Sequence, residues 1–425
     1  MKIRFVTLGC KLNFAESSAL GKELLLRGHQ RATLNEVPDV CVVNTCSVTD
    51  AADHKDRQTI NQLHRKYPNA TIVVTGCYAQ LQPEQISQIE GVDYVLGQNE
   101  KYDIPQLIEE IEKHACLTDP QETHTKNIIR VAAIREVDDF HGVHSADDRT
   151  RCFIKVQDGC NYFCTYCTIP YARGKSRNPK IAEVVIDAQT ALNQGAKELI
   201  ITGVNIGDFG RSTGEQFIDL LRAFDQLDGD YRVRISSCEP NLLTDEIIDF
   251  VANSKHFAPH FHIPLQSGSN EVLAIMKRRY TRELFAERVQ HIRKVMPHAF
   301  IGVDCMVGVR GETEACWEDY LAFIRGLDVS QLHVFTYSER AHTRMLELDL
   351  YVVPKAERQR RSKILHAVSE EKTSAFYAQH AGRTAVVLWE SKKEGDQMSG
   401  FTDNYIKVYG PYKKEKINTF EEIVL

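Results

Sequence analysis

Short apolar runs alternate with amphipathic stretches from Met1 to about Ala115. Continuous apolar runs are typical of buried parallel strands, and apolar residues spaced three and four apart indicate helices. The pattern predicts strands at Ile3–Gly9, Asp39–Asn44, Thr71–Gly76 and Tyr94–Leu96, and helices at Glu16–Arg27, Asp53–Lys66 and Ile104–His114. We therefore expect residues 1–118 to form an α/β domain built on a parallel sheet.

A polar, irregular stretch over residues 119–150 predicts a linker, and the alternation then resumes. Strands are predicted at Cys152–Gln157, Glu198–Thr202, Arg232–Ser236, His260–Leu265, Ala299–Met306 and Gln331–Thr336. Helices are predicted between them, at Ile181–Gln194, Thr244–Ser254, Arg282–Val295 and Glu312–Arg325. Successive strand–helix units of this kind over residues 151–381 are typical of a partial (βα)6 barrel.

The character of the chain changes again over residues 382–425. Short alternating runs separated by polar turns predict strands at Thr384–Trp389, Asn404–Tyr409 and Glu421–Val424. We expect a small all-β module after the barrel.

Composition narrows the class of protein. A hydrophobic share of 43% and a charged share of 26% are typical of a soluble globular protein. The net charge of -6 argues against a general nucleic-acid coat protein, so any RNA binding requires a local basic patch. No apolar run reaches membrane-spanning length and no secretory segment is visible, so we expect a cytoplasmic protein with no membrane partner.

The chain contains 12 cysteines, which is unusual for a protein of a reducing compartment. Disulfides are rare there, so clustered cysteines indicate metal binding or catalysis. Isolated cysteines are more often small core residues. We interpret the following in that way: Cys41, Cys116, Cys152, Cys238, Cys305 and Cys316.

Three cysteines, Cys160, Cys164 and Cys167, follow the first predicted barrel strand. Loops at the carboxyl ends of barrel strands build active sites. A zinc site would need four ligands, whereas three thiolates on a [4Fe–4S] cluster leave one iron open. That iron can bind S-adenosylmethionine and pass it an electron, which releases a 5′-deoxyadenosyl radical. The alternatives are a zinc knuckle or a chance grouping of cysteines.

Three further cysteines, Cys10, Cys46 and Cys77, each follow a predicted strand of the N-terminal sheet. Ligands of open α/β sheets bind at the carboxyl edge, so these thiols should converge there. Gly9 and Gly76 would let the backbone approach a ligand closely. The positions predict a second cluster with an open iron. The alternative is three strand-end cysteines without a ligand.

With these two cysteine triads, the chain resembles the methylthiotransferases of the radical S-adenosylmethionine superfamily. The resemblance rests on both cysteine triads and on the runs Gly9–Asn13, Asn44–Thr49, Thr75–Cys77, Ile169–Gly174, His262–Gly268 and Arg278–Thr281. It implies an N-terminal methylthiotransferase domain, a radical barrel and a C-terminal TRAM domain. It also implies that Cys10, Cys46 and Cys77 hold an auxiliary [4Fe–4S] cluster, which carries the sulfur that is methylated and inserted.

The same resemblance supplies cofactor contacts and partners. Candidates to contact S-adenosylmethionine are Tyr166, Thr202, Gly203, Asn205, Ser236, Glu239, Gln266 and Ser267. Each polar residue among them has the alternative role of capping a loop. The implied partners are tRNA, an electron donor such as flavodoxin or ferredoxin, and a source of sulfur.

The first cysteine run separates the substrate classes. Gly9-Cys-Lys-Leu-Asn13 resembles enzymes that act on N(6)-threonylcarbamoyladenosine beside the anticodon. Enzymes for isopentenyladenosine usually read Gly-Cys-Gln-Met-Asn, and those for an aspartate of a small-subunit ribosomal protein usually read Gly-Cys-Pro-Lys-Asn. A non-catalytic iron–sulfur RNA-binding protein is a further alternative, and two complete triads argue against it.

Basic segments provide weaker indications of RNA binding. The final module carries lysines and aromatics that can hold phosphates and stack on bases: Lys392, Lys393, Lys407, Lys413, Lys414, Lys416, Phe401, Tyr405, Tyr409 and Tyr412. Acidic residues balance much of that charge. The segment Lys355–Lys363, with Arg358, Arg360 and Arg361, predicts a helix face that could also meet RNA.

Two runs depart from the family pattern. Gly308-Val-Arg-Gly-Glu-Thr313 stands where the family usually has Gly-Phe-Pro-Gly-Glu-Thr, and Arg340-Ala-His-Thr343 where it has Arg-Pro-Gly-Thr. Loss of proline and glycine alters the allowed backbone angles, so we expect altered late barrel loops.

Overall fold

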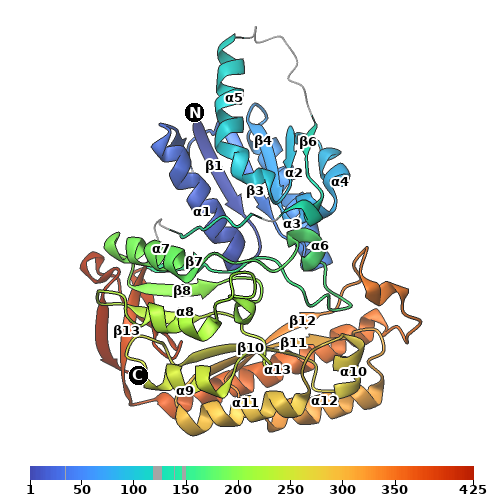
Figure 1. The fold of residues 1–425 in the computed structure, drawn as a ribbon, viewed down its shortest axis with the longest axis vertical. Helices are drawn as coiled ribbons and strands as arrows, with labels where there is room; N and C mark the ends of the chain where they lie inside the picture. Colours follow the sequence, from blue (N-terminus) through green and yellow to red (C-terminus); the bar gives the residue numbers. More distant parts are fainter. Residues whose placement is uncertain (34, 118–126, 138, 146–149) are drawn as a thin grey trace. The chain divides into compact units, whose positions relative to one another are not determined.

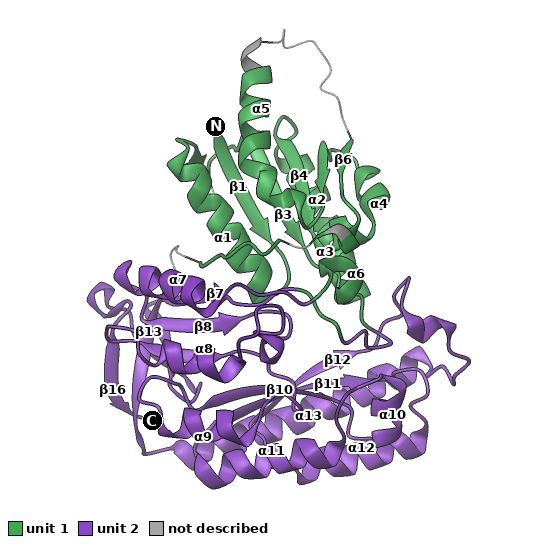
Figure 2. Cartoon of the chain, in the orientation of Figure 1, with its two compact units in different colours: residues 1–147, 159–161, 167–175 green, residues 148–158, 162–166, 176–425 purple. Residues whose placement is uncertain are grey.

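The computed structural model describes residues 1–33, 35–117, 127–137, 139–145 and 150–425, and it divides into two compact units (Figures 1 and 2). Unit 1 comprises residues 1–147, 159–161 and 167–175. Unit 2 comprises residues 148–158, 162–166 and 176–425. Parts of the predicted linker, residues 119–126 and 146–149, lie outside the described residues. Within the described ranges, every helix is too short or too polar to cross a membrane.

Unit 1 is built on a six-stranded parallel sheet with the strand order β2-β1-β3-β4-β5-β6. The strands are β1 (Lys2–Thr7), β2 (Gln30–Arg31), β3 (Val40–Thr45), β4 (Thr71–Gly76), β5 (Tyr94–Leu96) and β6 (Ile128–Arg130). The prediction of a parallel α/β sheet is confirmed. The sequence did not predict β2, nor β6, which lies in the stretch expected to be irregular.

Helices cover both faces of this sheet. Leucines and isoleucines of α1 (Lys11–Leu26) and α5 (Ile104–Leu117) pack with Val40 and Val42 on one face. Residues of α2 (Asp50–Lys66) pack with Cys41 and Val43 on the other face. Two short helices, α3 (Cys77–Leu81) and α4 (Pro83–Ser87), follow β4 directly. Cys41 is therefore a core residue, as its strand pattern predicts.

Unit 2 contains the six barrel strands in two parallel sheets of three, β7-β8-β9 and β10-β11-β12. A parallel bridge between Ser237 and His262 joins the two sheets. The strands are β7 (Arg151–Lys155), β8 (Glu198–Thr202), β9 (Arg232–Ile235), β10 (His260–Gln266), β11 (Phe300–Val307) and β12 (Gln331–Thr336). The predicted partial barrel is therefore confirmed.

An outer layer of helices packs on these strands (Figure 1). The helices are α7 (Ile181–Asn193), α8 (Phe217–Phe224), α9 (Asp245–Asn253), α10 (Asn270–Ile275), α11 (Arg282–Val295), α12 (Glu314–Gly326) and α13 (Lys355–His380). Alternate strand residues such as Ile201, Val233, Ile263 and Val303 form the core beneath them, because successive side chains of a strand point to opposite faces.

The chain ends in a four-stranded antiparallel sheet of order β15-β14-β13-β16. Its strands are β13 (Thr384–Glu394), β14 (Gln397–Thr402), β15 (Lys407–Pro411) and β16 (Phe420–Val424). This confirms a C-terminal all-β module. The strand predicted at Asn404–Tyr409 is wrong in its first half, because Tyr405 lies in a turn with φ +66°.

The C-terminal sheet docks on the amino ends of the first barrel strands. Arg232 donates to the carbonyl oxygen of Phe401 (3.0 Å), and Arg234 to those of Asp403 (2.9 Å) and Thr402 (3.3 Å). Both guanidinium groups also pair with Glu198, whose side chain is fully buried.

Tyr405 adds an aromatic contact to this docking. Its ring centroid lies 4.9 Å from that of His260 and 5.6 Å from that of Phe300. The module therefore closes the end of the barrel opposite the loops that follow the strands.

Candidate functional site

The three cysteines of unit 1 occupy equivalent places in the fold. Cys10 caps the amino end of α1, Cys46 directly follows β3, and Cys77 opens α3 after β4. Burial, together with the neighbouring thiols of Cys77 and Cys10, raises the pKa of Cys46 to about 12. The three thiols therefore lie within electrostatic reach of one another at the carboxyl edge of the sheet. Within the described ranges, no three metal-ligating side chains converge on a single ion, and thiolates of a [4Fe–4S] cluster bind separate irons.

Gly9 lets the first two cysteine loops approach each other. Its φ is +99°, and a Cβ there would lie 2.8 Å from Sγ of Cys46. Gly76 has a φ of +101° and faces the backbone of Thr45 in the same way. The glycines thus bring the cysteine loops together, rather than only making room for a ligand as the sequence suggests.

Asn13 ties two of these loops to each other. Its Nδ2 donates to the carbonyl oxygens of Leu8 (3.0 Å) and Thr45 (2.8 Å), which flank Cys10 and Cys46. The thiol of Cys10 lies 3.6 Å from Oδ1 of the same side chain. A single buried amide therefore fixes the spacing of two cysteine-bearing turns.

A buried charge network stands beside Cys77. Glu16 accepts hydrogen bonds from Lys101 (2.7 Å) and Arg173 (3.1 Å), and all three side chains are at most 1% exposed. Burial raises the pKa of Cys77, while Arg173 and Lys101 both act to lower it. Nε2 of Gln98 also donates to Sγ of Cys77 (3.4 Å). Cations and N–H donors around a buried thiol favour its thiolate, so this edge fits a thiolate-bound cluster.

Arg173 comes from the segment that follows the second cysteine motif. Residues 167–175, including α6 (Ile169–Arg173), belong to unit 1 with the first triad. Nη2 of Arg173 donates to Oδ1 of Asn13 (2.6 Å), and the hydroxyl of Thr168 donates to the carbonyl oxygen of Ser47 (3.2 Å). Cys160 and Cys167 therefore share a compact unit with the first triad. Arg173 belongs to the Ile169–Gly174 run that matches the family pattern, but the sequence alone gives it no role.

Cys164 lies in unit 2, beside a buried arginine that sequence analysis did not assign to the site. Nη1 of Arg278 donates to Sγ of Cys164 (3.3 Å) and lies 3.5 Å from the hydroxyl of Tyr166. Its Nη2 forms an ion pair with Glu239. Burial raises the pKa of Cys164, and Arg278 opposes that rise. Arg278 thus brings three predicted site residues together, and its only sequence signal was the Arg278–Thr281 run.

The loop after β8 offers an unsatisfied polar group. Oε1 of Gln157 accepts from the backbone N–H groups of Val204 (2.9 Å) and Asn205 (2.8 Å), which fixes the loop. The side chain of Asn205 is buried, and among the described residues neither its oxygen nor its nitrogen has a hydrogen-bond partner. Such orphaned groups are costly unless a ligand satisfies them. This position, next to Thr202 and Gly203, therefore fits a polar cofactor.

The remaining predicted contacts lie at the ends of β9 and β10. Gln266 adopts φ +64°, a conformation that non-glycine residues rarely take, and the strand register shifts just before it. Strain of this kind is common at ligand-binding sites. Ser267 is fully buried and its hydroxyl accepts from the N–H of Ser269 (3.2 Å), which is the loop-capping role. Ser236 is buried directly after β9.

The two runs that depart from the family pattern keep their turns by other means. Gly308 and Gly311 have φ of +76° and +85°, and His342 takes φ +65° in the place where the family usually has glycine. Arg310 pairs with Glu339 through two N–H···O bonds of 3.0 Å. This ion pair joins the two late loops. It therefore compensates for the proline and glycine that these loops lack.

The three arginines at the start of α13 are engaged within the protein. Arg361 is 1% exposed and pairs with Glu312 (2.7 Å). Arg358 donates to the carbonyl oxygen of Val353 (2.9 Å), and Arg360 pairs with Glu357 (2.6 Å). The hypothesis that this face binds RNA is wrong for Arg361, because a buried guanidinium cannot meet a phosphate.

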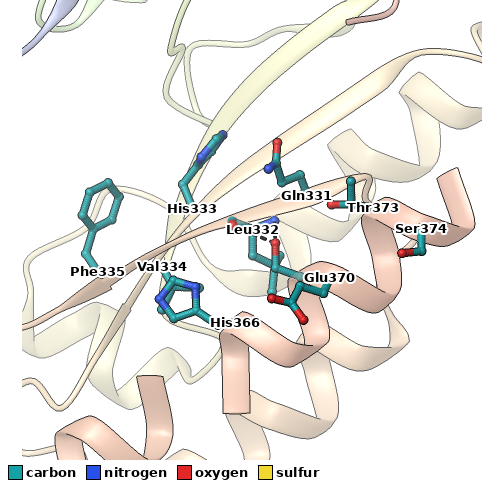
Figure 3. A pocket seen from close by; sticks show the side chains of 10 residues that line it. Gln331, Leu332, His333, Val334, Phe335, His366, Glu370, Thr373 and Ser374 are labelled. Carbon is teal, nitrogen blue, oxygen red and sulfur yellow. Dashed lines mark hydrogen bonds between the residues drawn. The ribbon is translucent and has the colours of Figure 1, made fainter. Parts of the chain in front are cut away.

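A separate cavity of about 570 Å³ runs along β12 and α13. Figure 3 shows the side chains that line it: Gln331, Leu332, His333, Val334, Phe335, His366, Ser369, Glu370, Thr373 and Ser374. None of these is a predicted cluster or cofactor residue, so the cavity is distinct from the sites above.

Comparisons with known proteins define the class. Residues 2–97 match the family described as Uncharacterized protein family UPF0004, and residues 154–324 match the Radical SAM superfamily. The solved methyltransferase TsrM of Kitasatospora setae, with cobalamin and a [4Fe-4S] cluster, has a TM-score of 0.58 at 16% identity. The alignment covers 81% of this chain and 76% of TsrM, which shows a shared fold. The chain is a radical S-adenosylmethionine enzyme, a class that implies S-adenosylmethionine and a [4Fe–4S] cluster.

Curated relatives define the family. The threonylcarbamoyladenosine tRNA methylthiotransferase MtaB of Bacillus subtilis is 36% identical over 96% of this chain and 89% of its own length. The tRNA-2-methylthio-N(6)-dimethylallyladenosine synthase of Desulfitobacterium hafniense is 29% identical over 100% of this chain and 94% of its own length. The chain belongs to the methylthiotransferase family.

Proposed function

We propose that this enzyme adds a methylthio group to carbon 2 of N(6)-threonylcarbamoyladenosine in the anticodon loop of tRNA. The observation that carries the proposal is near-full-length similarity to relatives named for that substrate. Five of them are 31–36% identical to this chain, whereas three relatives named for dimethylallyladenosine are 29–30% identical. A loop base suits such chemistry because it can be splayed out of the stack.

We assign the two triads to two [4Fe–4S] clusters. Cys160, Cys164 and Cys167 hold the radical cluster, and Cys10, Cys46 and Cys77 hold the auxiliary one. When bound, these groups supply a 5′-deoxyadenosyl radical from S-adenosylmethionine and a methylated sulfur for insertion.

The protein's own residues position these groups. We assign the carboxamide of Asn205 and the carboxylate of Glu239 to the polar part of S-adenosylmethionine, and Tyr166 to its adenine. Thr202, Gly203 and Ser236 shape the strand ends around it, and Gln266 and Ser267 complete the set. In unit 1, Arg173 and Lys101 hold the local charge that favours thiolate at Cys77.

The residues of the first cysteine run differ in burial and in their hydrogen bonds. Leu12 is buried in the core, and Asn13 uses its amide to join the cysteine loops. Lys11 is partly exposed at the first turn of α1. Lys11 and Leu12 are the two residues of this run that differ between the substrate classes, and we assign base recognition to Lys11 and a scaffold role to Leu12 and Asn13.

We further propose that the C-terminal sheet is a TRAM domain that binds tRNA, and that residues 1–118, 151–381 and 382–425 are three domains joined by the 119–150 linker. The exposed lysines of the module are suited to phosphate contacts. A reducing partner such as flavodoxin or ferredoxin and a sulfur donor complete the reaction.

The test offers the purified, reconstituted enzyme three substrates in parallel. These are tRNA with threonylcarbamoyladenosine, tRNA with isopentenyladenosine, and the small ribosomal subunit, with the Cys160→Ala variant as control. Mass analysis should find a methylthio product on the first alone. Product on either of the others, with none on the first, would show that the substrate assignment is wrong. No product on any, with intact clusters, would favour a non-catalytic iron–sulfur RNA-binding protein.

A further inference from the structure

We propose that Arg278 is a positioning residue that makes the radical cluster easier to reduce. It does so through a charged N–H···S hydrogen bond to Cys164, with Glu239 held on the same guanidinium. The inference rests on the proposed assignment of Cys164 as a cluster ligand. It concerns a residue outside both cysteine triads and outside the predicted cofactor contacts.

The guanidinium of Arg278 is almost completely engaged. Nη1 donates to Sγ of Cys164 (3.3 Å), Nη2 pairs with Glu239, and Nε donates to the hydroxyl of Tyr280 (3.1 Å). The side chain of Arg278 is 4% exposed and that of Glu239 is 15% exposed. Each of the three nitrogens of the planar guanidinium therefore has its own acceptor, an arrangement that a lysine cannot reproduce.

Tyr280 fixes the orientation of this fork. Its single hydroxyl proton is shared between the carbonyl oxygens of Pro264 (2.5 Å) and Leu265 (2.9 Å) near the end of β10. With its proton used in this way, the hydroxyl oxygen accepts from Nε of Arg278. The ring of Tyr280 also lies under the guanidinium, 5.0 Å from centroid to carbon. Arg278 is thus held rigidly to the barrel before any cofactor binds.

The electrostatic consequence follows from the charge at the sulfur. Reduction adds one negative charge to a cluster and its thiolates, and a buried cation hydrogen-bonded to a thiolate stabilises that more negative state. Glu239 keeps the buried guanidinium paired without removing its N–H from Cys164. Arg278 should therefore raise the reduction potential of the cluster.

A purely structural role for Arg278 makes a different prediction. If the residue served only to neutralise Glu239, its replacement would lower stability but leave the potential of the cluster unchanged. The reduction potential therefore separates the two roles.

The experiment uses full-length protein in which Cys10, Cys46 and Cys77 are replaced by Ala, so that only the radical cluster remains. Its midpoint potential is measured by a redox titration followed by electron paramagnetic resonance. Arg278→Gln should move the potential to more negative values, and Arg278→Lys should produce a smaller shift because it keeps the charge but loses the fork. Arg282→Gln, which removes a partly exposed arginine of α11 that pairs with Asp319 of α12, is the matched control and should produce no shift.

Cleavage of S-adenosylmethionine provides a second readout. The Arg278→Gln variant should lose more activity with a flavodoxin-type donor than with dithionite, because only the weaker reductant is limited by the potential. If Arg278→Gln alone fails to retain iron, the double variant Arg278→Gln/Glu239→Gln is measured in its place, because it also removes the carboxylate that would be left buried without its partner. An unchanged potential in whichever of these variants holds the cluster overturns the proposal. If Cys164→Ala keeps its full radical-cluster iron, the ligand assignment fails instead, independently of Arg278.

Discussion

Arg173 donates a 2.6 Å hydrogen bond to Oδ1 of Asn13, a residue 160 positions earlier in the chain. Asn13 lies one helical turn after Cys10, and Arg173 closes the short helix that follows Cys167. The bond therefore connects the immediate surroundings of two different cysteine motifs. Both partners are 1% exposed, so neither can exchange the other for water without unpacking this part of unit 1.

Replacing Arg173 by Gln should destabilise the protein by about 3–5 kcal/mol, because it breaks a buried ion pair by removing one partner of Glu16. Thermal unfolding of the apoprotein measures this. The same variant should lose iron from the auxiliary cluster, since Cys77 loses a cation that favours its thiolate. Arg27→Gln, which removes an exposed pair with Glu109, should leave the melting temperature nearly unchanged. Equal melting temperatures for the two variants would contradict the prediction.

The iron content should report two separate clusters. Anaerobically reconstituted protein should hold about eight irons, as two [4Fe–4S] clusters require. Replacing Cys160, Cys164 and Cys167 by Ala should halve this number, and so should replacing Cys10, Cys46 and Cys77. Chemical iron analysis measures the content, and an unchanged count in the second variant would remove the auxiliary cluster from the proposal.

The two triads should differ in what they catalyse. The variant without Cys10, Cys46 and Cys77 should still cleave S-adenosylmethionine to 5′-deoxyadenosine but form no methylthio product. The variant without the other triad should do neither, because it lacks the source of the electron. Chromatography of both products from the same reaction is the measurement. Formation of 5′-deoxyadenosine by the second variant would disprove the assignment of the radical centre.

Replacing Glu198 by Gln should cost about 3–5 kcal/mol of stability, because Arg232 and Arg234 would lose their buried counter-ion. Burial alone would raise the pKa of Glu198, but the two guanidinium groups outweigh it and lower the pKa overall. Because the pKa of Glu198 is lower in the folded than in the unfolded protein, its carboxylate stabilises the fold fully above the unfolded pKa of about 4.3. This stabilisation is lost progressively as the pH falls from there toward the folded pKa.

Unfolding free energies measured from pH 7 to pH 3 test this prediction. The difference between wild type and Glu198→Gln should shrink as the pH falls below about 4. A difference that does not change with pH would show that the charge of Glu198 is not what holds the module to the barrel.

Replacing both Lys413 and Lys414 by Gln should weaken tRNA binding and reduce its dependence on salt. Both side chains are exposed on the C-terminal module. Loss of two phosphate contacts should make the plot of log binding constant against log salt concentration less steep, with its slope smaller in magnitude by about one to two. Filter binding across a salt series measures the slope, with Lys294→Gln on α11 as control. Point variants suit this test better than truncation, since removing the module would uncover the buried arginines of the barrel.

Strand positions in both units could be predicted because their signal is local. Strand β8 was predicted at its observed bounds, since Glu198–Thr202 is a continuous run between polar turns. Strand β14 (Gln397–Thr402) was missed because its Ser399-Gly400 pair is typical of a turn. In the structure, a Cβ on Gly400 would lie 2.5 Å from a methyl of Val387, so the glycine is needed for close strand packing.

The cysteines of the site could be predicted because metal ligands have characteristic spacings and strand-end positions. The arginines could not, because their partners are distant in the chain. Arg278 reaches Cys164 across 114 residues, and Arg173 reaches Glu16 across 157. Contacts of this kind leave no periodic or compositional pattern, so only the folded backbone reveals them.

The contact of Tyr405 with Phe300 and His260 also constrains how the protein is made. The ribosome delivers Tyr405 only after all six barrel strands have emerged, so a nascent barrel has its base open until synthesis is almost complete. During that interval the paired aromatic surface is exposed to chaperones and to other nascent chains. A message that stops between α13 and β14 should therefore yield an aggregation-prone product, even though every predicted cluster ligand has already been translated.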